Sequence, residues 1–199
     1  MQLSPSEFPV KNSPWGKIDI AVRLADGITR VHTPGHGGIH LSRKRLNAMP
    51  VYFRAECADG SFFEEDSCWA VVAITFPEAF DARANDAAKQ TLLGSFPDLY
   101  ERHYGVTVEP GQSWKRDQAL FEVANADNFV VSAAWGDWEE TTPKGMVKVC
   151  ARKKSTGEEK FFLVPAAEYA TPRRTFAGFV ITDHPETTPA KGGSSKRVA

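Results

Sequence analysis

Hydrophobic residues near the N-terminus alternate in the pattern of a β-strand. Ile18, Ile20 and Val22 stand at every second position, which places their side chains on one face of an extended chain. Residues 25–27, Ala-Asp-Gly, favour a turn, and residues 28–31 return as a second apolar segment. The pattern therefore predicts a β-hairpin.

The segment that follows the hairpin predicts a glycine loop, a short helix and another strand. The glycine loop comes directly after the return strand. Ser42 can cap a helix that continues to about Met49, and Pro50 is expected to end it. Residues 51–54, Val-Tyr-Phe-Arg, are rich in β-branched and aromatic side chains and are predicted to form a strand.

Apolar residues then recur with the period of an α-helix. The residues at i, i+3, i+4 and i+7 from Trp69 are all apolar and define one helix face. This helix is expected to begin after Asp66 or Ser67 and to end at Pro77. Further helices are predicted over residues 82–93 with Gly94 as the stop, 95–105 with Gly105 as the stop, and 113–124.

The C-terminal part of the chain predicts β-structure. Its strands are rich in valine and aromatic residues, and residues 155–158 form a turn between two of them. The order of β, α and β segments indicates an α+β protein with an antiparallel sheet. The predicted strands cover residues 129–135, 146–152, 160–164 and 176–181.

Length and composition predict one folded domain with extended ends. The chain has 199 residues, of which 42% are hydrophobic and 25% charged, so a sizeable core is available. Residues 1–14 are rich in proline and are predicted to form an extended lead-in. Residues 15–184 are expected to form a single α+β domain, and residues 185–199, which are poor in apolar side chains, a disordered tail.

The charge of the chain argues against nucleic acid as the main ligand. The formal net charge is −1, whereas proteins that bind phosphate backbones usually carry a basic excess or patch. The basic runs Arg43-Lys44-Arg45 and 152–154 are interpreted chiefly as solvated faces. A local binding contact is the alternative, so Arg43, Lys44 and Arg45 are retained as candidate binding residues.

Cysteine usage and hydropathy favour a bacterial cytoplasmic location. Cys57, Cys68 and Cys150 include no short-spaced pair, which argues against a disulfide framework and against a cysteine-based zinc site. No secretory signal is visible, and no apolar stretch approaches the roughly 18 residues that a membrane span requires. No contact with a membrane is predicted.

The richest candidate chemistry lies in residues 32–40, His-Thr-Pro-Gly-His-Gly-Gly-Ile-His. In one interpretation, His32, His36 and His40 bind a metal ion, because imidazoles spaced by four residues can share one face of a helix. Pro34 and the glycines disfavour the regular helix or strand that such an alignment needs. Neither a metal nor a cofactor is therefore predicted.

In a second interpretation, His36 acts as a general acid or base beside an anion pocket formed by glycine N–H groups. Its carboxylate partner would come from the acidic segment 64–66, which leads into the predicted helix at Trp69. The candidate catalytic residues are His36, Glu64, Glu65 and Asp66, and the candidate binding glycines are Gly35, Gly37 and Gly38.

A third interpretation is structural, and we favour it. The glycines would form a compact turn, and His36 would bond a nearby carbonyl or carboxylate and so join the hairpin to the helix. Acidic residues in the first turn of a helix are favourable without any chemistry. Trp69, Trp135 and Trp138 are interpreted as core residues, or alternatively as part of a partner or ligand surface.

Several of these segments together resemble one family of proteins. The chain carries Thr-Pro-Gly-His-Gly-Gly-Ile at residues 33–39, Leu-Ser at 41–42, Met-Pro at 49–50 and Glu-Glu-Asp-Ser-Cys-Trp-Ala at 64–70. This combination resembles a poorly characterised family of bacterial proteins found on plasmids, phages and integrated elements. The resemblance covers about residues 14–80.

The resemblance implies an accessory protein of a mobile element that acts inside a bacterium. Such proteins often bind and inhibit a host defence complex, so the expected partner is a host protein or ribonucleoprotein, for example of a CRISPR or restriction system. The alternative hypothesis is a small hydrolase or transferase, with His36 as the proton shuttle and Glu64, Glu65 or Asp66 as its partner.

Overall fold

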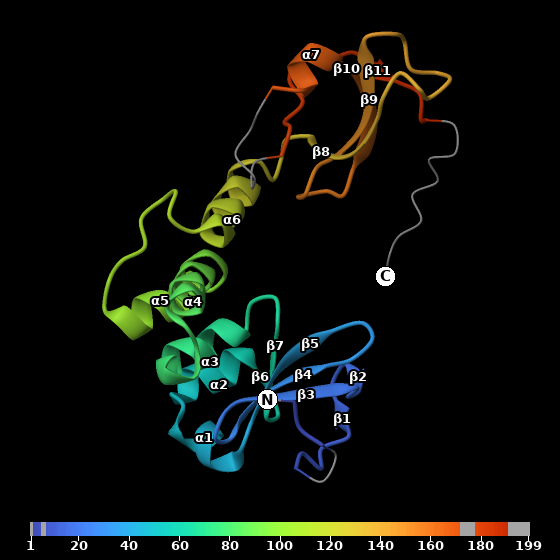
Figure 1. The fold of residues 1–199 in the computed structure, drawn as a ribbon. Helices are drawn as coiled ribbons and strands as arrows, with labels where there is room; N and C mark the ends of the chain where they lie inside the picture. The colour runs from blue at the N-terminus through green and yellow to red at the C-terminus, as the bar shows by residue number, and fades with distance from the viewer. Residues whose placement is uncertain (1, 5–6, 172–177, 191–199) are drawn as a thin grey trace. The chain divides into compact units, whose positions relative to one another are not determined.

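The computed structural model describes residues 2–4, 7–171 and 178–190 (Figure 1). The chain divides into two compact units, residues 1–113 and 114–199, in place of the single domain expected over residues 15–184. The physical reason is that each unit has its own sheet and its own hydrophobic core. Both units combine helices with antiparallel sheets, which confirms the predicted α+β class.

The first unit is built on a five-stranded antiparallel sheet in the order β3-β4-β5-β7-β6. The predicted hairpin is confirmed as β3 and β4, with Gly27 in the turn at a φ of 71° that favours glycine. Strand β5 extends the hairpin on its other side. The strands are β3 Ile20–Ala25, β4 Ile28–His32, β5 Gly37–Leu41, β6 Ala58–Asp59 and β7 Phe62–Glu64.

The N-terminal segment covers one face of this sheet. Leu3 is buried, and its backbone N–H donates to the carbonyl of Ala21 at 2.8 Å. Residues 12–13 form strand β1 (Asn12–Ser13), which pairs with β2 (Gly16–Lys17). The expected lead-in is therefore in part a component of the fold, because its apolar side chains cover Val31 and Phe62.

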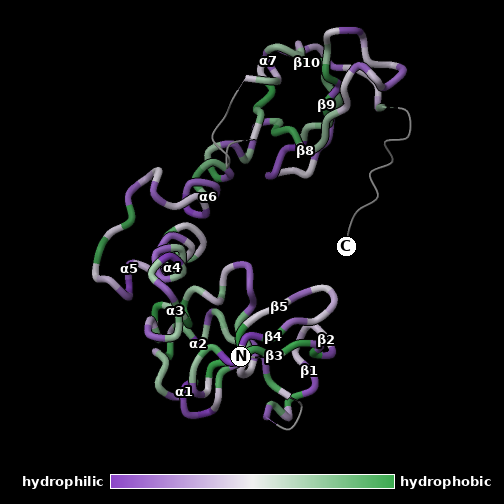
Figure 2. The backbone as a smooth tube through the Cα atoms, viewed as in Figure 1, coloured by the Kyte–Doolittle hydropathy of each residue, from purple (hydrophilic) through white to green (hydrophobic). Residues whose placement is uncertain are grey.

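The helices of the first unit cover the opposite face of the sheet. The core between the two layers includes Ile28, Leu41, Phe53 and Val71, none of which is exposed to solvent. Figure 2 shows the apolar stretch of α3 in green, in agreement with its central position. The helical segments are α1 Arg43–Ala48, α2 Val51–Cys57, α3 Trp69–Thr75, the 3₁₀ turn η1 Pro77–Ala79, α4 Ala82–Ser95 and α5 Pro97–Tyr104.

Two predictions in this region are wrong. Residues 51–54 begin helix α2 and do not form a strand, because Phe53 and Cys57 are four residues apart and are both buried on one helix face. Gly94 does not stop α4, which continues to Ser95. The stop comes from Pro97, which disfavours the helical conformation for the residue before it.

The predicted helix ends elsewhere are largely confirmed. The Ser42 hydroxyl caps α1 by accepting the backbone N–H of Arg45 at 3.4 Å. Gly105 ends α5 in the left-handed conformation, with φ at 66°. Helix α3 ends just before Pro77, as expected.

The second unit contains helix α6 (Trp114–Ala124) and a four-stranded antiparallel sheet in the order β11-β10-β9-β8. Helix α6 and the three strands that follow it in the chain, at residues 130–135, 146–152 and 159–165, lie close to the ranges that the sequence predicts. Its core is formed by Val149, Ala151, Phe162 and Val164. The remaining elements are β8 Val130–Trp135, β9 Met146–Arg152, β10 Glu159–Pro165, α7 Ala166–Tyr169 and β11 Glu186–Thr187.

The C-terminal segment differs from its prediction where it is described. Within the predicted strand 176–181, Val180 makes an isolated bridge to Val130, while residues 176 and 177 lie outside the described residues. Part of the expected disordered tail pairs with β10 as strand β11. The rest of that tail, residues 191–199, also lies outside the described residues. Among the helices described, none is long and apolar enough to cross a membrane.

A buried ion pair organises the loop between β8 and β9. The ammonium of Lys148 lies 3.5 Å from the Glu139 carboxylate, and the side chain of Lys148 is fully buried. Lys148 also donates to the hydroxyl of Thr141, and Glu139 accepts from the hydroxyls of Thr141 and Thr142 at 2.9 and 2.8 Å. The loop is therefore held by polar groups that satisfy one another inside the protein.

We expect Lys148→Met to destabilise the second unit strongly. The substitution removes a buried cationic partner of Glu139, which typically costs about 3–5 kcal/mol of unfolding free energy. Urea denaturation followed by circular dichroism measures the change. Lys153→Met is the matched control, because its ion pair with Glu158 is partly exposed and is expected to contribute less than about 1 kcal/mol. Equal losses for the two variants would contradict this assignment.

Candidate functional site

His36 stands at the end of a tight loop that joins β4 to β5. The backbone N–H of Thr33 donates to the carbonyl of His36 at 2.8 Å. The Thr33 hydroxyl donates to the same carbonyl at 2.8 Å and accepts the His36 N–H at 3.1 Å. These bonds fix the backbone of the loop, and they leave the side chain of His36 exposed at its edge.

Gly37 and Gly38 do not form a turn, contrary to the prediction. They begin strand β5, and neither adopts the left-handed conformation. A side chain on Gly38 would overlap the carbonyl oxygen of Phe63 and the indole of Trp15, and one on Gly37 would overlap the carboxylate of Glu65. Glycine is required at position 38 because a backbone carbonyl and an aromatic ring approach the strand closely, whereas at position 37 the nearest group is the end of the flexible Glu65 side chain.

This close approach joins the acidic segment to the glycine strand. Gly38 pairs with Glu64 across β5 and β7, and the backbone N–H of Glu65 donates to the carbonyl of Gly37 at 3.2 Å. The carboxylate of Glu65 accepts the N–H of Gly37 at 2.8 Å. The acidic segment is therefore joined to the sheet by Glu65 and the backbone of Gly37, whereas the structural interpretation expected His36 to make this link.

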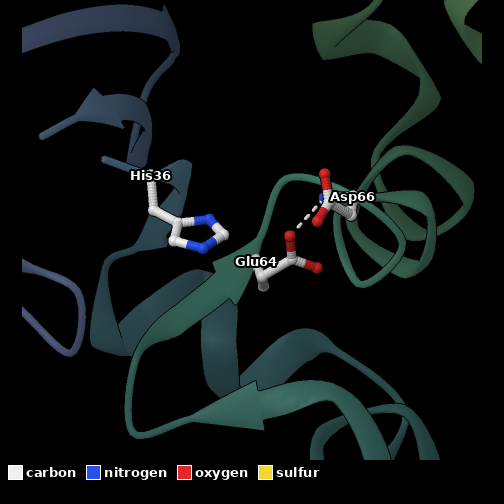
Figure 3. A group of neighbouring side chains, drawn as sticks. All are labelled: His36, Glu64 and Asp66. Atoms are coloured by element: carbon white, nitrogen blue, oxygen red, sulfur yellow. Dashed lines mark hydrogen bonds between the residues drawn. The ribbon is translucent and has the colours of Figure 1, made fainter. Parts of the chain in front are cut away.

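The two other acidic residues face the loop histidine. One ligand atom from each of His36, Glu64 and Asp66 lies within 4.8 Å of the other two. Figure 3 shows the imidazole pointing toward the Glu64 carboxylate, with Asp66 beside it. The Glu64 carboxylate also accepts the backbone N–H groups of Asp66 at 2.5 Å and of Ser67 at 3.2 Å, which fixes its orientation. We call these three residues the His36 cluster.

A small cavity opens beside the cluster. Its volume is about 270 Å³, and Glu65 forms part of its wall. Arg30 and His32 enter it from one face of β4, because residues two apart on a strand point the same way. Sequence reasoning missed Arg30, which lies on the predicted strand two residues before His32, and this spacing was a usable signal. The described residues that line the cavity are Arg30, His32, Gly38, Ile39, Glu65, Trp69 and Ala84.

The three histidines of the loop occupy different environments. His32 lines the cavity, and His36 belongs to the cluster. His40 lies on β5 between Phe8 and Phe62, with ring centroids 5.2 and 4.9 Å away. Burial lowers the pKa of the His40 imidazole. The structure thus assigns His40 to packing.

The three residues of the basic run Arg43-Lys44-Arg45 on α1 also lie in different environments. The Nε group of Arg45 donates to the carbonyl of Asp26 at 2.9 Å, and its guanidinium pairs with Glu78 at 3.0 Å. These contacts explain Arg45 as a residue that holds α1 against the hairpin turn and η1. Arg43 and Lys44 are exposed on the helix surface.

The three candidate tryptophans also lie in different environments. Trp69 begins α3 and contributes to the cavity wall, while its ring packs 6.3 Å from that of Phe80. Trp135 and Trp138 belong to the second unit. There Trp135 packs 6.1 Å from Phe161, and Trp138 is 75% exposed.

Two cysteines that are distant in the sequence form a thiol pair. Cys57 ends α2, and Cys68 immediately precedes α3; both are free thiols. A hydrogen bond between them lowers the pKa of Cys68 and, together with burial, raises the pKa of Cys57. Sequence reasoning missed this pair because only the packing of α2 against the segment before α3 brings the thiols together.

The fold and the site thus define an α+β protein with a polar surface site beside a small cavity. Residues 9–126 match the model of a family described as a domain of unknown function, DUF7007. This match covers more than half of the chain, and the protein belongs to that family. Comparisons with curated proteins and with solved structures give no match.

We expect Gly38→Ala to destabilise the first unit by about 1–3 kcal/mol, because the added methyl group overlaps the Phe63 carbonyl and the Trp15 ring. Gly35→Ala is the matched control in the same loop. A methyl group there meets no atom within 4 Å, so its expected effect is small or slightly stabilising. Thermal melting of the two variants checks the difference, and equal melting temperatures would refute the close-approach explanation.

We expect iodoacetamide to modify Cys68 before Cys57, because Cys68 is more exposed and has the lower pKa of the pair. Cys57→Ala removes the hydrogen bond that lowers the pKa of Cys68, so the alkylation of Cys68 should then require a higher pH. Peptide mass spectrometry across a pH series measures both effects. Cys150→Ala should leave the alkylation of Cys68 unchanged, since Cys150 lies in the second unit.

Proposed function

We propose that this protein is a binding protein that recognises a partner through the cavity and the adjoining His36 cluster. The observation that carries the proposal is the cavity of about 270 Å³. The residues that line it include the aromatic Trp69, the basic Arg30 and the acidic Glu65.

The cavity can accommodate a single side chain of a protein partner. Its volume of about 270 Å³ lies close to the lower end of the range of about 300–1,000 Å³ that is usual for small-molecule pockets. It suits one inserted side chain, as at interfaces where a single anchor residue fills a pocket of the other protein. The opposite charges of Arg30 and Glu65 would then fix the orientation of the anchor.

The proposed setting is the cytoplasm of a bacterium, with the protein acting as an accessory factor of a phage or plasmid. The support is the resemblance of residues 33–39 and 64–70 to the family found on mobile elements. In this proposal, the partner is a host protein or ribonucleoprotein complex, such as a CRISPR or restriction complex, and binding inhibits it. The small net charge of −1 favours a protein surface over a nucleic-acid backbone as the main contact.

A small hydrolase or transferase is the second candidate function. The specific observation in its favour is that Glu64 and Asp66 lie near the His36 imidazole, where a carboxylate can orient a general base. Against it, the exposed His36 lies outside the described wall of the cavity, whereas a catalytic histidine should face the bound substrate.

We expect the tagged full chain to retain a stoichiometric partner complex from the lysate of a bacterial host. Arg30→Ala and Trp69→Ala should each reduce its recovery about tenfold or more, because anchor contacts contribute about 2 kcal/mol or more to binding. Lys89→Ala is the control, since this exposed α4 residue is not among those lining the cavity. Quantitative mass spectrometry measures recovery, and melting curves establish that each variant is folded.

Equal recovery by the wild-type chain and both cavity variants would overturn the proposed binding surface. The hydrolase candidate predicts a different result, in which no stoichiometric partner is retained and the purified chain turns over ester or phosphoester substrates. His36→Gln would then reduce turnover by about 10²–10⁴-fold without affecting the melting curve.

A further inference from the structure

We infer that His36, Glu64 and Asp66 form a binding site for one divalent transition-metal ion, of which Zn²⁺ is the best-suited probe. An imidazole nitrogen and two carboxylate oxygens are ligands that such ions accept together. This inference goes beyond the proposed recognition of a partner. It also differs from the sequence hypothesis of a three-histidine site, since only one of those histidines takes part.

The distances within the cluster suit a metal ion after a small adjustment. The three ligand atoms lie within 4.8 Å of one another. Ligands bound tetrahedrally to one zinc ion at about 2.0–2.2 Å lie roughly 3.4 Å apart. His36 and Asp66 are exposed, so rotation of their side chains can close the remaining distance.

Glu64 is the ligand whose side chain is already held in position. Its carboxylate is held by the backbone N–H groups of Asp66 and Ser67, and its backbone is paired with Gly38. Hydrogen bonds of this kind orient metal ligands and strengthen metal binding. Each carboxylate oxygen has two lone pairs, so a bond to an N–H group leaves one lone pair for the ion.

Helix electrostatics does not account for this arrangement. The sequence suggested that the acidic residues occupy the first turn of a helix, where negative charge is favourable. In the structure, α3 begins at Trp69 and has no acidic residue in its first turn. Glu64 instead lies at the end of β7, where its carboxylate and that of Asp66 both face an imidazole. A bound cation would relieve the repulsion between these two carboxylates.

A bound ion would join two segments that both contribute to the cavity. His36 comes from the β4–β5 loop, whereas Glu64 and Asp66 come from the segment that leads to α3. Gly38 and Glu65, their neighbours in the chain, line the cavity. Three protein ligands also leave a coordination position open on the exposed side, where water or a donor group of a partner can bind.

The test is a titration of the chelator-treated full chain with ZnCl₂ by isothermal titration calorimetry. We expect the wild-type chain to bind one equivalent and to melt at a higher temperature when loaded. His36→Ala and Asp66→Asn should each weaken binding about tenfold or more. His184→Ala is the matched control, because it removes a histidine that lies 3.1 Å from a carboxylate, that of Glu168, in the second unit.

Three outcomes would overturn the inference. The first is the absence of a saturable equivalent in the wild-type chain. The second is that His36→Ala and Asp66→Asn bind Zn²⁺ as tightly as the wild-type chain, and the third is loss of the bound equivalent in His184→Ala. His36 and Asp66 are exposed, so the metal-free variants should melt like the wild-type chain. Should His36→Ala melt lower, His36→Gln, which keeps a side chain of similar length, repeats the measurement.

Discussion

The close approach of β7 to the glycine strand β5 is the constraint on which the site depends. Gly37 and Gly38 carry no side chains, so the Phe63 carbonyl, the Trp15 ring and the Glu65 carboxylate can occupy the space where a Cβ atom would stand. The pairing of Gly38 with Glu64 then brings the acidic segment beside the loop that carries His36. A side chain at position 38 would push β7 and the Trp15 ring away from β5, because it would overlap the Phe63 carbonyl and that ring.

The residues of the acidic segment have different roles. Glu64 ends β7, and Glu65 begins the turn that follows it. Glu65 turns toward Gly37 and the cavity, whereas Glu64 turns toward His36. The same short segment therefore fixes the strand, forms part of the cavity wall and contributes to the cluster.

Local sequence signals predicted much of the secondary structure, and the failures have physical causes. The Ser42 cap and the Gly105 stop were visible because each acts through its own residue. The segment 51–54 was predicted wrongly because four residues are too few to distinguish a strand from the start of a helix. The glycines of β5 suggested a turn because glycine permits both a turn and a close approach, and only the neighbouring strand decides between them.

The sequence by itself determined the α+β class and most helix and strand positions, and it singled out His36 and residues 64–66 as candidate site residues. Periodicity, capping residues and residue chemistry are local properties, so they can be read along the chain. Only the tertiary structure decided that the three loop histidines separate, that Arg30 and Trp69 share a cavity, and that Cys57 meets Cys68. These relations depend on which strands pair and how helices pack on them, and such long-range contacts leave no fixed spacing in the sequence.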